Sequence, residues 1–564
     1  MKSLPAKNWR VLNSCSSSSL ADIKEALLKN RGLDDLRIST DFFADLTDVE
    51  LDVLSVLSPN DLSAALALIK EAISSNLPII IHGDYDVDGI SATAILWETI
   101  YRGLRYKNCR PYIPNRFEDG YGLSSSSVVA CGKLAESLGG TLRQAQGKLG
   151  LLITVDCGIT AVKSVEEATE LGFKVLVIDH HQKPENELPE CQFLWSEKLC
   201  AGGLAYFLAQ ALLPGSTGLD LATLATIADL QPLTGLNRSL VKKGLVMLNK
   251  SSRIGLQALR EVAGLRGKNL GVYEVGWALG PRLNASGRLE TALDSLRLLC
   301  TTNETEAHDL ALKLSEVNNL RQAKTAEMLS HAENLLVEKA DSAVIVAGDS
   351  SYHEGVIGLV AGKLCQKYHR PTVVVSIGEE FSKGSARSIT GFNIVEALRS
   401  ASHLLENVGG HPAAAGFTIK TSNLPEFEQA LQAYSKEILT EELLTPDLKV
   451  DLCLPLDVVA WELYDLVSQF EPFGLGNPEP VFCSNGVTVV DVRRMGSTNK
   501  HLSLMLRSNN SSFRAVGFGM GETEAELKPG AKVDVAYTLS KNEWQGRRSL
   551  ELIVKDIKNV AIHL

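Results

Sequence analysis

The sequence predicts an α/β protein: a doubly wound parallel sheet domain, a long connecting helix, a second α/β domain and a C-terminal β-barrel. Its 564 residues exceed what one hydrophobic core normally organises, so several domains are expected. After residue 76, aliphatic runs typical of buried parallel strands alternate with helical patterns. After residue 456, short alternating runs are separated by Gly- and Asn-rich turns, as in small barrels of the OB type.

The first α/β domain is expected at residues 77–300, after a helical lead-in over residues 1–76. Within the lead-in, apolar positions recur at helical spacing in residues 21–28 and 51–73. Strand-like runs follow, each before a turn and a helical pattern, at residues 77–81, 150–155 and 174–178. The polar stretch 141–149 fits neither pattern and is interpreted as a surface insertion.

Residues 301–340 are expected to form the connecting helix, because residues 304–336 contain no Gly or Pro and mix apolar with charged positions. The second α/β domain is expected at residues 341–440, with strands near 343–346 and 371–375. Residues 445–456 hold two prolines and are interpreted as a boundary. The barrel domain is expected at 447–564, with strand-like runs at 486–492, 501–506, 513–518, 532–539 and 549–557.

The composition is that of an ordinary globular protein, with 45% hydrophobic and 22% charged residues. No apolar run approaches the roughly 18 to 20 residues that span a bilayer, and the start lacks a secretory core, so a cytoplasmic protein without a membrane partner is expected. Ten cysteines without a CxxC pair indicate reduced thiols, not disulfides or a zinc finger. The net charge of -11 excludes an overall basic surface, yet residues 481–564 hold 12 Lys and Arg against 8 Asp and Glu.

The most informative segment is HGDYDVDG, residues 82–89, which lies between an aliphatic strand and a helical pattern. In an extended segment, the carboxylates of Asp84, Asp86 and Asp88 project from the same side. Three carboxylates at such short distances raise one another's pKa unless a cation lies between them. A solvated acidic turn is the alternative. An EF-hand calcium loop is excluded, because its twelfth position requires Glu and is Ile95 here, and because a strand precedes the segment.

Further acidic groups and histidines follow the ends of later strands. Asp156 ends the run LLITVD, and Asp179, His180 and His181 end the run KVLVIDHH. Asp229 lies in the apolar stretch ATLATIADLQPL, where a carboxylate is costly to bury unless it is paired or metal-bound. A lone Asp at a strand end is often only a cap, but ligands of open α/β sheets gather at this edge. Together these groups can hold two divalent cations, Mn²⁺ or Mg²⁺, which suits phosphodiester hydrolysis.

Four segments in order, HGDYDVDG, VDCG, IDHH and IADLQPL, resemble the motifs of the DHH phosphoesterase superfamily, and the chain most resembles its RecJ branch. The resemblance implies a DHH-type sheet domain, a DHH-associated second domain and an OB-type barrel. It also implies two metal sites bridged by Asp156, and a His181 that contacts the scissile phosphate or protonates the leaving oxygen. The other implied ligands fall into two groups, one of His82 or Asp84 with Asp86, the other of Asp88, His180 and Asp229.

Two loops of the first domain resemble substrate-binding segments of the RecJ branch. The segments PNR at 114–116 and GYGL at 120–123 resemble the loop that binds the 5′ end of the strand, which implies contacts from Arg116 and Tyr121. The segment GPRLNASGR at 280–288 resembles one that contacts the strand backbone, which implies a contact from Arg282. Arg forms a fork for phosphate oxygens, and an exposed Tyr can stack on a base.

The second α/β domain carries GSARS at 384–388 and GGHPAAAGF at 409–417. Small residues permit close backbone approach, and a strand-to-helix turn can present N–H groups to an anion. A purely structural glycine turn is the alternative. By resemblance to the DHH-associated domain, these segments close over the substrate phosphates, which implies substrate contacts from Ser385, Arg387, Gly409, Gly410 and His411.

The C-terminal segment favours a polymeric substrate, because its basic residues accompany aromatic side chains as in OB-type binders of single strands. These residues are Arg493, Arg494, Lys500, Arg547 and Arg548, with Phe513, Phe518 and Trp544. The family resemblance implies that this polymer is single-stranded DNA. The resemblance further implies a monomeric 5′→3′ exonuclease that releases 5′-mononucleotides in DNA repair and recombination. A single-stranded-DNA-binding protein or a helicase is the expected protein partner.

Two alternatives stay open. A phosphodiesterase of short oligonucleotides or cyclic dinucleotides would use the same metals and would not need residues 445–564. An inactive DNA-binding replication scaffold of the same fold would be expected to have lost metal ligands, whereas the set in this sequence is complete.

Overall fold

The computed structural model describes residues 7–13, 19–35, 40, 42–44, 56–116, 118–120, 122–140, 149–184, 186–336, 342–544 and 546–559. Tyr121 and most of the expected insertion, residues 141–148, lie outside this part of the chain, as does the side chain of Trp544. The chain divides into two compact units. Unit 1 comprises Met1–Ala44, Glu327–Phe473 and Pro478–Leu564, and unit 2 comprises Asp45–Ala326 with Gly474–Asn477.

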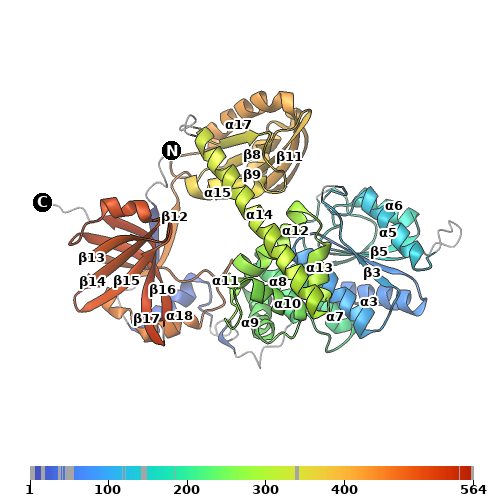
Figure 1. Ribbon diagram of the computed structural model, residues 1–564, viewed down its shortest axis with the longest axis horizontal. Coiled ribbons are helices and arrows are strands. Elements are labelled where there is room, and N and C mark those ends of the chain that lie inside the picture. The colour runs from blue at the N-terminus through green and yellow to red at the C-terminus, as the bar shows by residue number, and fades with distance from the viewer. Residues whose placement is uncertain are drawn as a thin grey trace. The chain divides into compact units, whose positions relative to one another are not determined.

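Unit 2 is built on a five-stranded parallel sheet in the order β3-β2-β4-β5-β6. Figure 1 labels β3 and β5 of this sheet. The strands are β2 (Ile79–Gly83), β3 (Cys109–Tyr112), β4 (Gly150–Val155), β5 (Phe173–Asp179) and β6 (Gln192–Trp195). The three predicted strands correspond to β2, β4 and β5, and they are almost entirely buried because both faces of the sheet are covered.

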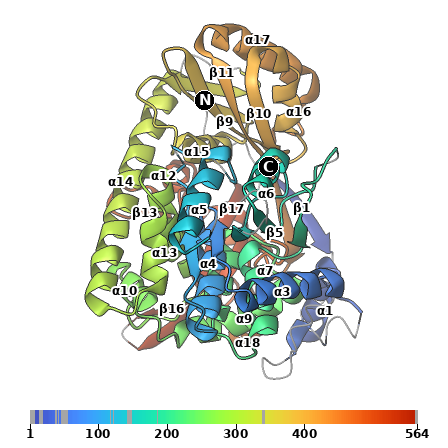
Figure 2. The ribbon, with the colours of Figure 1, turned by 90° about the vertical axis from the view of Figure 1, so that its right-hand side faces the viewer.

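Helices cover the two faces of this sheet, which confirms the doubly wound arrangement (Figure 2). Successive residues of a strand point to opposite sides. Ile79 and Ile81 therefore pack in the core that contains α4 (Val87–Trp97) and α7 (Ala201–Leu212). Ile80 packs instead in the core that contains α5 (Ser125–Ser137) and α6 (Val162–Glu170).

The remaining helices of unit 2 surround the first core. They are α3 (Pro59–Ser74), η2 (Glu98–Gly103), α8 (Leu219–Ala228), α9 (Gly235–Asn249), α10 (Ile254–Val262), α11 (Val272–Glu274), η3 (Val275–Leu279), α12 (Gly280–Leu289) and α13 (Leu293–Cys300). Helix α14 (Glu304–Leu336) covers the residues without Gly or Pro on which the connecting helix was predicted, and its 33 residues span about 50 Å. None of the described helices is both long and apolar enough to cross a membrane.

The second α/β part of the chain, in unit 1, has a five-stranded mixed sheet in the order β10-β11-β9-β8-β7. The strands are β7 (Ile345–Asp349), β8 (Thr372–Ser376), β9 (Phe381–Arg387), β10 (Leu405–His411) and β11 (Ala414–Lys420). Its helices are α15 (Ile357–Tyr368), α16 (Ile394–Arg399) and α17 (Leu424–Ile438), with short η4 (Ser402–Leu404) and η5 (Thr421–Asn423). Strands β7 and β8 overlap the two runs that the sequence predicts.

Five strands near the C-terminus close into a barrel, as predicted. They are β13 (Phe482–Met495), β14 (His501–Ser508), β15 (Ser511–Gly517), β16 (Lys532–Trp544) and β17 (Arg547–Asn559), and β13 pairs with β16 to close the ring. Within the segment interpreted as a boundary, β12 (Asp447–Cys453) pairs in parallel with the start of β13. Helix α18 (Trp461–Ser468) and the short η6 (Leu456–Val458) and η7 (Gly521–Glu526) complete this part.

The expectation of a purely helical lead-in was wrong for its first residues. Strand β1 (Asn8–Asn13) pairs in parallel with β12, and helix α1 (Leu20–Asn30) places Ile23 and Leu27 in the barrel core. Residues 1–44 accordingly cluster with the C-terminal part, whereas α3 belongs to unit 2. Four of the six residues of β1 (NWRVLN) are exposed, and the strand pairs with β12, far along the sequence. Nothing local therefore marks this segment as a strand.

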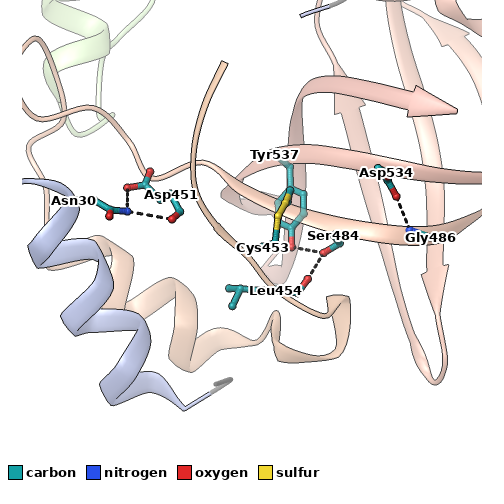
Figure 3. The surroundings of a disulfide bond; sticks show 9 residues. Asn30, Asp451, Cys453, Leu454, Ser484, Gly486, Asp534 and Tyr537 are labelled. Carbon is teal, nitrogen blue, oxygen red and sulfur yellow. Dashed lines mark hydrogen bonds between the residues drawn. A yellow bond between two sulfur atoms is a disulfide. The ribbon is translucent and has the colours of Figure 1, made fainter. Parts of the chain in front are cut away.

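The expectation that all cysteines are reduced was wrong for one pair. Cys453 and Cys483 are joined by a disulfide, with Cα atoms 4.4 Å apart (Figure 3). The two residues are register partners on β12 and β13, so the sheet brings together thiols that lie 30 residues apart. Beside them, Ser484 donates to the carbonyl of Leu454 at 2.7 Å and lies 2.9 Å from the hydroxyl of Tyr537.

Candidate metal centre and nucleic-acid interface

The acidic side chains and histidines predicted from the motifs gather at one edge of the unit 2 sheet. Asp84 follows β2, Asp156 follows β4, and Asp179 ends β5. The carboxyl ends of neighbouring parallel strands lie side by side, which brings these groups together. Asp229 joins them as the C-cap residue of α8.

Two of the carboxylates are fixed by helix N-termini. Asp86 is the N-cap of α4, and its Oδ1 accepts from the backbone N–H of Asp88 at 2.9 Å and of Gly89 at 3.2 Å. Asp88 is buried and accepts at 2.8 and 2.7 Å from the backbone N–H groups of Ala201 and Gly202, at the start of α7. The positive end of a helix dipole stabilises each negative charge.

Close packing at these helix starts requires glycine. A Cβ on Gly89 would lie 2.5 Å from the backbone nitrogen of Asp84, and a Cβ on Gly202 would lie 2.4 Å from the Cβ of Ala225. The backbone of the acidic loop therefore lies directly against α4, and α7 lies directly against α8. The glycines set how closely the carboxylates approach one another.

The side-chain ligand atoms form overlapping groups of three, within each of which they lie no more than 4.8 Å apart. The groups, among the described residues, are Asp84 with Asp86 and Asp156, Asp88 with His180 and Asp229, and Asp156 with His180 and His181. The first two groups have the composition that the family resemblance implies for two metal sites. The third group connects them, because it contains Asp156 from one and His180 from the other.

His180 lies at the centre of the carboxylates. Its Nε2 is 3.1 Å from Oδ1 of Asp156, 3.5 Å from Oδ2 of Asp88 and 3.8 Å from Oδ2 of Asp229. The side-chain nitrogen of Gln231 lies 2.8 Å from Oδ2 of Asp229 and 3.3 Å from Nδ1 of His180. This amide therefore holds a carboxylate and an imidazole of the same group in place, a role that the sequence reasoning missed.

Burial makes the metal-free cluster electrostatically unfavourable. Desolvation, with the charge of Asp86 next, raises the pKa of Asp84 to about 8. Desolvation together with the neighbouring carboxylates also raises the pKa of Asp88 and of Asp156 well above the usual range. Burial raises the pKa of Asp229 to about 6. Divalent cations would remove this repulsion, and the mix of carboxylate oxygen and imidazole nitrogen fits Mn²⁺ or Mg²⁺.

Asp156 and Asp84 show further signs of a ligand site. Asp156 has a left-handed backbone, with φ of +62°, which is uncommon for a residue other than glycine and clusters at functional sites. Oδ1 of Asp84 is buried without a hydrogen-bond partner among the described residues. A buried carboxylate oxygen without a donor is costly unless it binds a cation.

His82 is the one predicted ligand that joins none of these groups among the described residues. It is fully buried, and desolvation lowers its pKa to about 4, so its ring is neutral at neutral pH. Its Nδ1 lies 3.6 Å from Sγ of Cys157, and its Nε2 has no hydrogen-bond partner in the described part of the chain. The geometry therefore favours Asp84 over His82 for the first group.

His181 is held by Asp179, which does not belong to any of the ligand groups in the described chain. Nδ1 of His181 lies 2.7 Å from Oδ1 of Asp179, and Oδ2 of Asp179 accepts from the backbone N–H of Ile159 at 3.0 Å. Burial opposes a charged imidazole, but this hydrogen bond and the charges of Asp179 and nearby acids raise the pKa of His181 to about 9. The ring is therefore protonated at neutral pH and can donate a hydrogen bond or a proton.

An arginine cluster lies beside the acidic loop. The guanidinium of Arg116 lies 5.3 Å from the ring centre of Tyr85. Burial, with the charges of Arg116 and Arg321 next, lowers the pKa of Arg288 to about 10. Burial and the charge of Arg282 also lower the pKa of Arg321, and Nε of Arg321 is buried without a hydrogen-bond partner among the described residues.

The members of this cluster come from different elements. Arg282 and Arg288 lie on α12, Arg321 lies on α14, and Arg116 follows β3. Arg282 is partly engaged, since it donates to the carbonyl of Ala278 at 2.7 Å. Four neighbouring guanidinium groups repel one another unless an anion lies among them, so the cluster is suited to phosphate. Arg321 was missed by the sequence reasoning, because a single Arg on a long helix carries no motif.

The second α/β part of the chain aligns its predicted residues across three strands. Ser385 on β9 pairs with Gly416 on β11, which pairs with Gly409 on β10. Arg387 and His411 are connected in the same way through Ala414. Residues that pair across strands share a face of the sheet, so these side chains lie on one face.

The helix start near Ser385 and Arg387 is that of α15, which the sequence reasoning did not single out. A Cβ on Gly358 would lie 3.0 Å from Nη2 of Arg387 and from Oγ of Ser385. Gly409 and Gly410 lie in strand β10, which pairs with β11, and not in a strand-to-helix turn. A guanidinium, a hydroxyl and backbone N–H groups at a helix start are suited to an anion.

The barrel presents part of the predicted binding surface. Arg493, Arg494 and Lys500 are exposed, and Phe518 is 63% exposed with its ring edge-on to His501 at 5.5 Å. Phe513 differs from expectation, because it is partly buried against the barrel core. Arg547 and Arg548 are also exposed. The predicted binding residues that are exposed are therefore basic side chains and one phenyl ring. Such a surface can bind a single strand.

Comparisons with known proteins agree with this architecture. Three family models match the chain: DHH family, N-terminal domain at residues 78–230, DHHA1 domain at residues 341–437, and RecJ OB domain at residues 450–556. The single-stranded-DNA-specific exonuclease RecJ of Bacillus subtilis (strain 168) is 34% identical over 548 residues, which cover 94% of this chain and 67% of that protein. RecJ of Haemophilus influenzae is 31% identical over 557 residues, which cover 91% of this chain and 94% of that protein.

Solved structures show the same similarity. The crystal structure of RecJ from Thermus thermophilus in complex with Mn²⁺ matches with a TM-score of 0.80 and 31% identity, covering 98% of this chain and 80% of that one. RecJ from the same organism in complex with Mg²⁺ matches with a TM-score of 0.73 and 30% identity. This match covers 98% of this chain and 78% of that one. The sequence identity over nearly the whole chain, the three matched domains and the shared fold show that this chain belongs to the RecJ family.

Proposed function

We propose that this chain is a metal-dependent exonuclease that hydrolyses single-stranded DNA from the 5′ end and releases 5′-mononucleotides, in DNA repair and recombination. The observation that carries the proposal is the pair of ligand groups connected through Asp156 and His180. The relatives are named single-stranded-DNA-specific exonucleases, and the matched Thermus structures hold Mn²⁺ or Mg²⁺.

In this proposal, each ligand group holds one divalent cation. Asp84, Asp86 and Asp156 would hold the first, and Asp88, His180 and Asp229 would hold the second, with Asp156 close enough to His180 to serve both. Asp84 is preferred to His82 because, among the described residues, its carboxylate belongs to a group of three ligand atoms and the His82 ring belongs to none. When bound, a pair of such ions activates water and stabilises charge on the attacking and leaving oxygens.

The residues around the ions orient the strand and move the proton. His181, protonated and held by Asp179, donates the proton on its Nε2 to the oxygen that leaves when the P–O bond breaks. Arg116, Arg282, Arg288 and Arg321 pair with phosphate oxygens of the strand. Fixed guanidinium groups also limit how the scissile phosphate can rotate, which favours attack in line with the leaving oxygen.

The second α/β part and the barrel bind further parts of the strand. Ser385, Arg387 and the start of α15 form an anion site that accepts a phosphate, with Gly409, Gly410 and His411 on the adjoining strands. The exposed basic residues of the barrel attract the strand backbone. The base contact of Tyr121, the monomeric state, the cytoplasmic location and the recruitment of a single-strand-binding protein or a helicase stay predictions from the sequence.

The test uses end-labelled single strands, blunt duplex and a dinucleotide, each with Mn²⁺. Wild type is compared with Asp156→Asn, which neutralises the shared carboxylate and tolerates the left-handed backbone better than alanine does. Asp309→Asn on the exposed side of α14 is the matched control. We expect mononucleotides from the 5′ end of the single strand, at least 1000-fold slower release in Asp156→Asn as an order of magnitude, and wild-type rates in the control.

The same experiment separates the alternatives. Cleavage of the dinucleotide alone would favour a small-substrate phosphodiesterase. Binding of single strands without cleavage of any substrate would favour an inactive scaffold, although the complete ligand groups argue against one.

A further inference from the structure

Two large aromatic side chains of unit 2, Tyr273 and Trp277, lie on the surface. Their side chains are 70% and 74% exposed, and their rings are stacked with centroids 6.3 Å apart at 27°. Trp is among the most highly buried residues on average, so an exposed and ordered pair is unusual. Neither residue belongs to a motif discussed above, and neither is used by the proposed reaction.

The pair is held on a rigid element. Residues of α11, η3 and α12 form one helical run from Val272 to Leu289, and η3 is a π-helical turn, which is frequent at functional sites. Val275 and Leu279, which flank Trp277, are buried. The two aromatic residues are four positions apart, the spacing at which helical side chains meet. The exposed rings therefore have a fixed place on the surface.

The same helical run contacts the metal centre at two points. Asn284 accepts a hydrogen bond at 2.9 Å from the backbone N–H of Val87, between the carboxylates of Asp86 and Asp88. On the other side, a Cβ on Gly280 would lie 3.6 Å from the Cβ of Ala228, the residue before Asp229. Eleven positions along the run, at most about 17 Å at the α-helical rise, separate Tyr273 from Asn284, which is a distance of a few nucleotides along a strand.

Arg282 lies between the aromatic pair and the metal centre on this run. Its guanidinium is bound to the carbonyl of Ala278, the residue after Trp277. Glu274, the acid beside Tyr273 in the sequence, accepts from the backbone N–H of Gly271 at 2.8 Å. The order along the run is thus an aromatic surface, a guanidinium and then the carboxylate loop, which matches the base, the backbone and the scissile phosphate of a bound strand.

We infer that Tyr273 and Trp277 form a stacking surface for nucleobases of single-stranded DNA, a few nucleotides from the scissile phosphate. The inference rests on the proposed function, because it needs a strand at the metal centre. Every base has an aromatic face, so stacking holds a strand without reading its sequence. A base paired in a duplex has both faces covered by its neighbours, so this surface favours unpaired strands.

The test compares full-length wild type with Trp277→Ala, with the double variant Tyr273→Ala and Trp277→Ala, and with Trp277→Phe. Trp461→Ala, at an aromatic residue 38% exposed at the start of α18, is the matched control. Affinity is measured in EDTA for a single strand with natural bases and for one of equal length with abasic positions. Cleavage is then measured with Mn²⁺ to separate kcat from KM, and melting temperature reports on folding.

We expect the double variant to bind the natural strand roughly 5- to 100-fold more weakly, with KM raised similarly and kcat at saturation unchanged. Trp277→Phe keeps most of the affinity, the control behaves as wild type, and melting temperatures are equal because both residues are exposed. A strand whose abasic positions lie over the two aromatic side chains has no bases to stack there. It is therefore expected to bind wild type and the double variant equally.

The outcomes that contradict the inference differ from those that contradict the proposed function. If wild type neither binds nor cleaves single strands, both fall. If wild type cleaves single strands but the double variant keeps the affinity and KM of wild type, only the stacking surface is wrong, and the pair serves another partner such as a protein.

Discussion

Nδ1 of His181 lies 2.7 Å from Oδ1 of Asp179, a carboxylate that also accepts from the backbone N–H groups of His180 and His181. This contact engages Nδ1, so it leaves Nε2 of the imidazole for the reaction, and it keeps the ring charged. Asp179 itself joins none of those groups among the described residues, so it is a positioning residue. Its removal is expected to affect the reaction through the His181 ring and through the backbone N–H groups of Ile159, His180 and His181 that it accepts from.

Asp179→Asn is therefore expected to lower kcat about 10- to 100-fold, with little change in KM. The pKa of His181, about 9, falls when the carboxylate is neutralised. Because the protonated ring is the active form, activity is lost as the ring deprotonates, and loss of this carboxylate moves the alkaline limb of the rate profile to lower pH. Rates across pH 6 to 10 check this, with exposed Asp465→Asn as control. An unmoved alkaline limb would show that His181 is not the proton donor.

Metal content distinguishes Asp84 from His82 in the first ligand group. Asp84→Asn is expected to lower bound Mn²⁺ from about two ions per chain to about one. His82→Gln is expected to keep about two, because His82 lies in none of the ligand groups of the described chain. Elemental analysis after reconstitution and desalting measures both. The reverse result would transfer the ligand role to His82.

The metal-free protein is expected to become less stable as pH rises from about 4 to 8. The pKa of Asp84 is about 8 in the folded protein against 3.8 unfolded, and that of Asp229 is about 6. Between these values the folded state holds protons that the unfolded state has lost, so each increase in pH favours unfolding. Melting temperatures in EDTA check this at several pH values.

Two further changes should remove that pH dependence. Added Mn²⁺ should raise the melting temperature most at high pH, where the carboxylates would otherwise repel. Asp156→Asn should raise the melting temperature of the metal-free protein at pH 8 by a few degrees and reduce the effect of Mn²⁺. A flat melting temperature between pH 5 and 8 for metal-free wild type would mean that the cluster relaxes without metal.

Arg321 is expected to contact a phosphate of the strand. Arg321→Gln should weaken binding to all sequences alike and make the dependence of log affinity on log salt shallower by about 0.7. Arg266→Gln is the control, because Arg266 is exposed and pairs with Glu261 at 2.8 Å away from the cluster. Affinities measured between roughly 50 and 200 mM salt give the slope. An unchanged slope would remove Arg321 from the strand-binding residues.

The sequence predicted the elements whose signal is local. Strand β4 begins and ends at the predicted residues, because it is a continuous aliphatic run, and helix α14 covers the uninterrupted helical pattern that predicted it. The acidic residues were predicted together because their motifs follow strands that end at the same sheet edge. Their grouping required only the topology, not the details of packing.

The features that were missed depend on residues far apart in the sequence. The disulfide joins residues 30 positions apart, and only the register of β12 with β13 brings them together. Arg321 becomes part of an arginine cluster only because Arg282 and Arg288, on another helix, lie near it. Gln231 likewise acts through Asp229 and His180, and no spacing in the sequence indicates such a contact.

The pairing of β1 with β12 has a consequence for how the chain is made. Asn8 and its partner Asp447 are separated by 439 positions, so a ribosome adding about 5 to 20 residues per second needs roughly 20 to 90 s to deliver the second strand after the first. During that time Asp45–Ala326 can fold, while β1 and α1 have no sheet or barrel core to join. Strand β1 thus reaches its native place only after β12, although it is made before the whole of Asp45–Ala326.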